Sequence, residues 1–297
     1  LIPKAALLES GKYYLAKMGE STGIPEKMIM ETAIQSMGLA ELAPFDIEKK
    51  VIEYAIARKD SLADMKVTGF CDLLSTDAPA PGGGSVAALC AAMSGALSSM
   101  VSNLTIDKKG YESVQEDALQ LAPIGQSIKE RAIHCIDVDT DAFYAMMDAM
   151  KLPKKSAEEI EYRNAEIEKC TQAAINAPLQ TLRISHEALE LAKKVAAIGN
   201  TNALSDAGVA ALTALAAAKA ANYNVMINLA GITDESYRAH TVAETKDLIA
   251  GWMIIDVDSE ARAIELAGEL SSAPGAGGAP IHEWLEVRPF LGLPPDY

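Results

Sequence analysis

Apolar residues recur every three or four positions along most of the chain, and this spacing predicts α-helices. The predicted helices cover residues 5–18, 25–37, 46–57, 85–104, 111–150, 156–198 and 205–231. Pro123 and Pro178 fall inside two of the longest and predict kinks there. Because long helices joined by short turns pack as antiparallel neighbours, the pattern predicts a mainly α protein, an antiparallel bundle of long helices.

The spacing of apolar residues changes near the end of the chain, after about residue 241. Residues 252–257 and 281–290 have the composition of strands. Between them, Ser259 is placed to cap a helix over residues 260–270. We therefore expect a small β-α-β segment appended at the C-terminus of the bundle.

Composition narrows the class of protein. The chain has 297 residues and a net charge of −15, and its four cysteines are far apart. Because nucleic acids and anionic membranes attract cationic surfaces, the charge argues against both as partners. Neither the cysteines nor the four histidines have metal-ligand spacing, so we expect no metal and a reducing cytoplasmic location.

A glycine-rich loop opens a long uncharged stretch that covers residues 78–106. The loop contains Gly82, Gly83 and Gly84, and we expect Ser85 to cap the helix that follows. A helix N-terminus of this kind offers free N–H groups to an anion or a carbonyl oxygen. The sequence is not a P-loop, because no Gly-Lys-Ser/Thr follows. On its own the pattern is equally consistent with a turn before a buried helix.

Helical spacing places Asp139 at the centre of an apolar stripe on the 111–150 helix. A carboxyl group on a core-facing stripe must be hydrogen-bonded, paired or functional. Burial would raise its pKa toward neutrality, which suits a group that shuttles protons. The alternative is that Asp139 braces a neighbouring backbone. Asp137 and Asp141 point to the other side and are expected to be solvated unless a partner covers them.

A second polar line on the last long helix includes Asp206, Asn224 and Asn228. Asp206 and Asn224 are about 27 Å apart along the axis, too far to serve one small site in one subunit unless the helix bends. Asn224 and Asn228 are one turn apart and could read the polar edge of a heterocycle, although interhelical hydrogen bonding explains them equally well.

Two adjacent lysines, Lys108 and Lys109, follow the far end of the uncharged helix. They could attract an anionic ligand tail. Lysine at a helix C-terminus is also favoured by the helix dipole alone.

Several short motifs together carry a resemblance to a known family. They are Ala80-Pro-Gly-Gly-Gly-Ser-Val-Ala-Ala88, Asp137-x-Asp139-x-x-Ala142-Phe143, Leu152-Pro153-Lys154, Gly199-Asn200-x-Asn202, Ser205-Asp206 and Asn224-Val225-x-Ile227-Asn228. In this order and spacing, residues 61–238 resemble the cyclodeaminase domain of formimidoyltransferase-cyclodeaminase.

The two ends of the chain resemble other segments. Residues 1–57 are similar to the tail of that family's transferase domain and its linker, without the bulk of the transferase, so we expect a fragment without transferase activity. Residues from about 243 onward resemble the C-terminal half of small ferredoxin-like proteins. The expected division is therefore 1–60, 61–241 and 242–297.

The resemblance implies a homodimer or higher homo-oligomer that uses a tetrahydrofolate derivative, polyglutamylated forms included, as its substrate. The implied reaction closes 5-formimidoyltetrahydrofolate to 5,10-methenyltetrahydrofolate and releases ammonia. An acidic catalytic residue is implied in the Asp137–Asp139 segment, and helix geometry favours Asp139 over Asp137. The implied substrate-binding residues are Gly82, Gly83, Gly84, Ser85, Lys108, Lys109, Asn200, Ser205, Asp206, Asn224 and Asn228. Two alternatives stay open: a methenyltetrahydrofolate cyclohydrolase, and an inactive helical dimerisation module.

Overall fold

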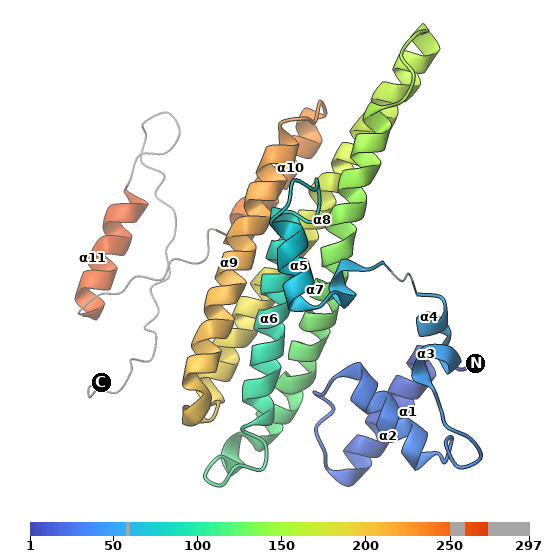
Figure 1. The fold of residues 1–297 in the computed structure, drawn as a ribbon. Coiled ribbons are helices and arrows are strands. Elements are labelled where there is room, and N and C mark those ends of the chain that lie inside the picture. Colours follow the sequence, from blue (N-terminus) through green and yellow to red (C-terminus); the bar gives the residue numbers. More distant parts are fainter. Residues whose placement is uncertain (58–59, 250–258, 273–297) are drawn as a thin grey trace. The chain divides into compact units, whose positions relative to one another are not determined.

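The computed structural model describes residues 1–57, 60–249 and 259–272 (Figure 1). The chain divides into two compact units, Leu1–Thr245 and Lys246–Tyr297. Within the described ranges the regular structure is helical, and the only β pairing is an isolated parallel bridge between Ile2 and Val51. The prediction of a mainly α bundle is confirmed.

The described residues contain eleven α-helices and three short 3-10 helices. The α-helices are α1 Lys4–Met18, α2 Glu26–Ser36, α3 Ile47–Lys50, α4 Ile52–Ala55, α5 Val67–Leu74, α6 Gly83–Asn103, α7 Gln115–Met150, α8 Ala157–Ile198, α9 Leu204–Leu229, α10 Glu235–Ile249 and α11 Glu260–Ser271. The 3-10 helices are η1 Leu62–Asp64, η2 Glu112–Val114 and η3 Thr201–Ala203.

The bundle is built from α6, α7, α8 and α9, and the uncharged helix α6 packs against the other three. Small side chains let these helices approach closely. At the crossing of α6 and α7, a Cβ added to Gly95 would lie 2.8 Å from the Gly125 carbonyl oxygen, and one added to Gly125 would lie 2.6 Å from the Gly95 oxygen. Only glycine fits at both positions of this crossing.

The N-terminal helices form a smaller core of their own, which includes Leu7, Met30 and Val51. The single helix predicted over residues 46–57 is wrong, because the structure divides it into α3 and α4 at Val51. Val51 is extended there and forms the bridge to Ile2, so the helical hydrogen bonds are interrupted. Asp46 caps α3 as expected.

A loop between α1 and α2 fixes this smaller core to the bundle. The carbonyl oxygen of Gly23 accepts hydrogen bonds from Ser99 Oγ at 3.0 Å, Asn103 Nδ2 at 2.7 Å and Gln126 Nε2 at 3.3 Å. Gly23 also lies so close to Ala122 that any side chain at position 23 would overlap it. The Ser21 hydroxyl of the same loop also donates to Asn103 Oδ1 at 2.8 Å, so the loop docks on α6 and α7 through several polar contacts and one close glycine.

A side chain on α9 replaces the hydrogen bond that the proline inside α8 cannot donate. Pro178 has no N–H to donate to the carbonyl of Ala174, four residues earlier in the helix. Asn228 supplies the missing donor, since its Nδ2 donates to the Ala174 oxygen at 2.8 Å. The start of α8 has the capping box that the sequence predicts, between Ser156 and Glu159.

The elements predicted for the C-terminal segment can be compared with the structure only in part. The helix predicted over residues 260–270 is present as α11. The two predicted strands, 252–257 and 281–290, lie outside the described residues. The expected boundary at residue 242 falls inside α10, a helix that the sequence pattern did not indicate.

Two segments, Gly83–Asn103 and Thr201–Leu229, are long and apolar enough to cross a membrane when judged by length and composition alone. The most apolar window of the first is 61% buried within the protein, whereas that of the second is 39% buried. Since the core helix of a soluble protein passes the same test, this is weak evidence for a membrane span.

Candidate functional site

The helix α6 starts earlier than the sequence indicates. Gly82 occupies the N-cap position, and Gly83 and Gly84 already belong to the first turn. The predicted cap, Ser85, is instead buried in the helix, where its hydroxyl donates to the Ile136 carbonyl at 3.1 Å and contacts Thr140 Oγ1 at 3.2 Å. Ser85 therefore joins α6 to α7, and the capping prediction is wrong because glycines take the first positions.

The carboxyl group of Asp139 lies against the first turn of α6. A Cβ added to Gly84 would overlap all three carboxyl atoms of Asp139, so position 84 has no room for a side chain. The unpaired N–H groups and the positive end of the helix dipole are at this first turn. The glycine loop thus brings a helix N-terminus directly to the predicted proton-transfer group.

Burial raises the pKa of the Asp139 carboxyl above its usual value. The backbone N–H of Ser85, and to a lesser extent its hydroxyl, act in the opposite direction on the same pKa. One helical turn before Asp139, burial also raises the pKa of the Cys135 thiol, which keeps that neighbour neutral. Burial therefore favours the protonated form of Asp139 more than water would, and the Ser85 groups partly offset this effect.

Asn224 approaches the same turn from α9. A Cβ on Gly83 would lie 3.5 Å from Asn224 Nδ2 and 3.8 Å from Asn224 Oδ1. The Nδ2 atom donates to the Ala220 carbonyl at 2.8 Å. Its Oδ1 atom accepts no hydrogen bond from the described part of the chain. Three elements thus converge here: the α6 N-terminus, Asp139 on α7 and Asn224 on α9.

Asp137 has a different environment, although it lies only two residues from Asp139. Its Oδ2 accepts a hydrogen bond from Ser61 Oγ at 2.6 Å, and its Oδ1 accepts one from the Leu62 N–H at 2.7 Å. Both oxygens are committed to the segment that leads into η1. Nothing in the sequence pattern indicated Ser61 and Leu62, because they lie more than 70 positions away.

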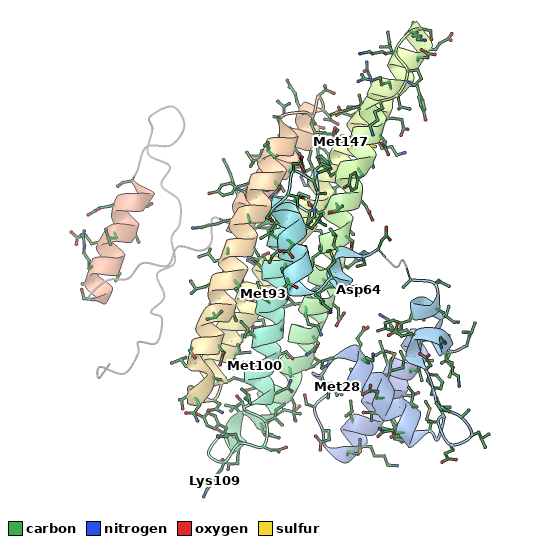
Figure 2. All side chains as sticks on the ribbon, in the orientation of Figure 1. Met28, Asp64, Met93, Met100, Lys109 and Met147 are labelled. Carbon is green, nitrogen blue, oxygen red and sulfur yellow. The ribbon has the colours of Figure 1, made fainter. Side chains whose placement is uncertain are left out.

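The remaining predicted substrate-binding residues do not join this group. Lys108, Lys109, Ser205 and Asp206 lie near the opposite end of α6, about 30 Å away by the length of that helix. Both lysines are exposed, and Figure 2 shows Lys109 at that end. Asn228 bonds the α8 backbone, which is the interhelical role that the sequence left open.

Asn200 also lies at this far end, and its polar groups are all occupied. Its backbone N–H donates to Thr105 Oγ1 at 2.9 Å, its Nδ2 donates to the Leu104 carbonyl at 3.1 Å, and its Oδ1 accepts from the Asn202 N–H at 3.0 Å. The residue is buried. Asn200 therefore ties the turn between α8 and α9 to the end of α6.

Groups of three or more His, Cys, Asp or Glu residues that could hold a metal ion are absent from the part of the chain that the structure describes. All four cysteines are free thiols. The chemistry that these residues offer is proton transfer by one carboxyl group, beside N–H groups that can bind a negative or carbonyl oxygen.

The fold and the site together define a helical-bundle protein with a buried carboxyl group against a helix N-terminus. The family model for formiminotransferase-cyclodeaminase matches residues 66–247, and the model for the formiminotransferase domain matches residues 1–57. The chain belongs to the formiminotransferase-cyclodeaminase family, a family of enzymes of folate metabolism. The resemblance identified from the sequence is confirmed.

The similar proteins include examples that are named for each of the two activities suggested by the sequence. A methenyltetrahydrofolate cyclohydrolase of Methylorubrum extorquens is 40% identical over 181 residues, which are 61% of this chain and 87% of that protein. The formimidoyltransferase-cyclodeaminase of Mus musculus is 31% identical over 81% of this chain and 45% of its own length. That of Dictyostelium discoideum is 34% identical over 84% of this chain and 46% of its own length. The chain therefore spans less than half of these two-activity relatives.

A solved structure supports the same grouping. The crystal structure of formiminotetrahydrofolate cyclodeaminase from Thermotoga maritima is 29% identical in sequence and superposes with a TM-score of 0.57. The superposition covers 63% of this chain and 89% of that protein.

Proposed function

We propose that this chain is a formimidoyltetrahydrofolate cyclodeaminase, which converts 5-formimidoyltetrahydrofolate to 5,10-methenyltetrahydrofolate and ammonia. The observation that carries the proposal is the Asp139 carboxyl group, which has a raised pKa and lies against the first turn of α6. Family membership and the similarity to a cyclodeaminase structure support the choice of reaction.

The reaction needs one proton removed and one delivered. N10 of the folate attacks the carbon of the formimidoyl group, which is protonated as an amidinium. The N10 proton leaves, the departing NH2 group gains a proton, and its bond to carbon breaks, so that ammonia leaves and the methenyl cation remains. A carboxylate with a raised pKa is a better base for the first transfer and returns the same proton in the second. In this proposal Asp139 carries both transfers. Asp137 does not, because both its oxygens already bind the 61–62 segment.

The substrate is held in this proposal by the groups around Asp139. The N–H groups at Gly83 and Gly84 would face the polar atoms of the folate next to the reacting carbon. The Asn224 amide, next to Gly83, would accept a hydrogen bond from the pterin. The substrate includes polyglutamylated forms, and the active species is a homodimer or a higher homo-oligomer.

A second candidate function is hydrolysis of methenyltetrahydrofolate. It is favoured by the match to the Methylorubrum cyclohydrolase, which is higher in identity than the matches to the two-activity relatives described above. The product of the cyclodeaminase reaction, methenyltetrahydrofolate, is the substrate of this hydrolysis. A carboxyl group in the position of Asp139 could activate water in place of N10. For residues 242–297 we retain the interpretation as a partial ferredoxin-like segment without activity of its own.

One pair of assays separates the candidates. Purified protein is supplied with 5-formimidoyltetrahydrofolate, and ammonia release is measured together with methenyltetrahydrofolate absorbance. In parallel it is supplied with methenyltetrahydrofolate, and the loss of that absorbance is measured against the spontaneous rate. Ammonia release that is enzyme-dependent supports the cyclodeaminase. Hydrolysis without ammonia release supports the cyclohydrolase, and no turnover with no folate binding supports an inactive helical module.

A further inference from the structure

Two buried hydroxyl groups, those of Ser85 on α6 and Thr140 on α7, lie next to each other beside Asp139. The Ser85 Oγ atom donates to the Ile136 carbonyl at 3.1 Å and lies 3.2 Å from Thr140 Oγ1. Ser85 is fully buried and Thr140 is 8% exposed, so bulk water does not compete for these hydrogen bonds. The mechanism proposed above gives neither hydroxyl group a role.

Counting hydrogens fixes the direction of the bond between the two hydroxyl groups. A hydroxyl has one hydrogen to donate and two lone pairs that accept. Since the Ser85 hydrogen points to the Ile136 carbonyl, the hydrogen between the two hydroxyl groups comes from Thr140. Thr140 is therefore the donor to Ser85 Oγ, whose own hydrogen can point to any acceptor within reach.

The Asp139 carboxyl group is a second acceptor for the Ser85 hydroxyl. It lies against Gly84, the residue before Ser85. Burial raises the pKa of Asp139, and hydrogen bonds from the Ser85 N–H and the Ser85 hydroxyl lower it. A single hydroxyl hydrogen cannot bond both the Ile136 carbonyl and Asp139 at full strength. An ionised carboxylate is the stronger acceptor, whereas a protonated one leaves the hydrogen to the carbonyl.

The groups around this pair on the facing helices are uncharged. Helix α6 has no charged residue, and α9 places the neutral Asn224 amide beside the first turn of α6. One turn before Asp139 on α7, burial raises the pKa of the Cys135 thiol, which therefore remains uncharged at neutral pH. A change at the Ser85 hydroxyl should thus act mainly on Asp139.

The charged neighbours on α7 have partners of their own. Arg131, two turns before Asp139, bonds Glu187 of α8 at 3.1 Å. Asp137 accepts a hydrogen bond from Ser61, as described above. Asp141 is exposed.

We infer that Thr140 is a positioning residue, which acts on Asp139 through the Ser85 hydroxyl. The inference rests on the proposed function, in which Asp139 takes a proton from N10 and returns it to the departing nitrogen. While Asp139 is ionised, the Ser85 hydrogen points to its carboxylate. While Asp139 holds the proton, that hydrogen points to the Ile136 carbonyl. Thr140 donates to Ser85 Oγ in both states, and no covalent bond of either hydroxyl group breaks.

The bond from Thr140 makes Ser85 a better donor. A hydroxyl that accepts a hydrogen bond donates more strongly, by about 10–30% per bond. The ionised form of Asp139 gains from this stronger bond, and the protonated form does not. Thr140 therefore helps Ser85 to lower the pKa of Asp139 against the effect of burial.

The direct test follows the titration of Asp139 by NMR, with protein labelled at the aspartate carboxyl carbon and the signal assigned by its loss in Asp139→Asn. Thr140→Val removes the hydroxyl and keeps the side-chain shape, so the titration midpoint should rise by about 0.3 pH unit. Thr140→Ser keeps the hydroxyl and should leave the midpoint in place. Thr241→Val is the matched control, since Thr241 is also buried and its hydroxyl bonds the Tyr237 carbonyl of α10.

A double-mutant cycle tests whether Thr140 acts through Ser85. Ser85→Ala removes the donor itself, so the midpoint of Asp139 should rise by about one pH unit. In the Ser85→Ala background, Thr140→Val should cause no further rise, because the hydroxyl through which Thr140 acts is gone. Equal shifts in both backgrounds would overturn the inference, and so would an unchanged midpoint in Thr140→Val.

The pH profile of kcat/KM carries the same prediction to catalysis. Because Asp139 acts first as a base, activity falls as pH drops through its pKa. This acid limb should move to higher pH in Thr140→Val and stay in place in Thr140→Ser and Thr241→Val. KM should stay within about twofold, since Thr140 is buried and contacts no substrate. A purely structural role would instead lower the melting temperature and leave the acid limb where it is.

The outcomes distinguish this inference from the proposed function. Turnover with no shift in the Thr140→Val midpoint overturns the positioning role and leaves the proposed function standing. An unaltered chain without turnover contradicts the proposed function, and the role of Thr140 in proton transfer falls with it. In that case the NMR titration still decides whether Thr140 acts on Asp139 through Ser85.

Discussion

The two ends of α6 have similar polar residues but use them differently. At the Leu104 end, the side chains of Asn200 and Thr105 and the hydroxyl of Tyr111 bond backbone groups of the neighbouring turn. At the Gly83 end, Asp139 and Asn224 lie beside the first turn of the helix, and Asp139 has a raised pKa. The first end is closed by its own hydrogen bonds, whereas the second keeps polar groups available for a ligand. A polar side chain is a better candidate for a ligand-binding site when backbone groups do not already use all of its hydrogen-bonding atoms.

The largest effect is expected for Asp139→Asn, which removes the proton carrier while keeping the side-chain shape. We expect kcat to fall by a factor of about 10²–10⁴, the contribution of a positioned acid–base group. The fold and the affinity for folate should be little changed, as measured by circular dichroism and by titration calorimetry. Full activity in this variant would remove Asp139 from the mechanism.

Next in size is Gly84→Ala, which places a methyl group where the Asp139 carboxyl now lies. The carboxyl group must move, and a displacement of about 1 Å costs roughly 100-fold in rate. Gly69→Ala on α5 is the matched control, because a Cβ there meets only the flexible end of Met65 at 3.5 Å. The measurement is kcat for both variants, and equal rates would show that the close approach of Gly84 is unimportant.

Asp137→Asn sharpens the contrast between the two aspartates. Loss of charge weakens the hydrogen bonds from Ser61 and Leu62, at a cost of about 1.5–3 kcal/mol in the free energy of unfolding. Because Asp137 anchors a segment and transfers no proton, kcat should stay within about tenfold of the unaltered value. Urea denaturation and steady-state kinetics measure the two effects separately. A loss of kcat equal to that of Asp139→Asn, without loss of stability, would reverse the assignment.

A smaller effect is expected for Asn228→Ala, which leaves the Ala174 carbonyl without its donor. We expect a loss of about 1–2 kcal/mol in the free energy of unfolding and no change in KM. In a Pro178→Ala background the helix supplies its own donor, so the cost of the same substitution should shrink. The double-mutant cycle is read from urea midpoints. A rise in KM without loss of stability would instead indicate that Asn228 binds the substrate.

The smallest expected effect is a gain in stability. The raised pKa of Asp139 means that the folded state disfavours the ionised carboxyl relative to the unfolded chain. Its contribution to stability is therefore present at low pH and is lost as pH rises through the folded-state pKa. Asp139→Asn should thus raise the melting temperature at neutral pH, and the difference should disappear in acid. A variant that is less stable than the unaltered protein at neutral pH would contradict this sign.

The sequence predicted what depends on short-range periodicity. The long helices, the capping box at Ser156 and the apolar stripe behind Asp139 all follow from residues a few positions apart. Contacts between distant segments could not be predicted in this way. Neither the bond between Ser61 and Asp137 nor that between Asn228 and Ala174 has a local signal. Ser85 was misplaced because cap preferences cannot tell that the glycines before it also enter the helix.

The bonds at the Gly23 carbonyl bear on how the protein unfolds. Three side chains from α6 and α7 converge on this one oxygen of the loop between α1 and α2. Opening the loop breaks these bonds together and uncovers Ala122, which is fully buried. We therefore expect the small N-terminal core to open together with its contact on the bundle, so that its backbone amides share one free energy of opening. A short helical segment can in this way share the stability of a much larger neighbour.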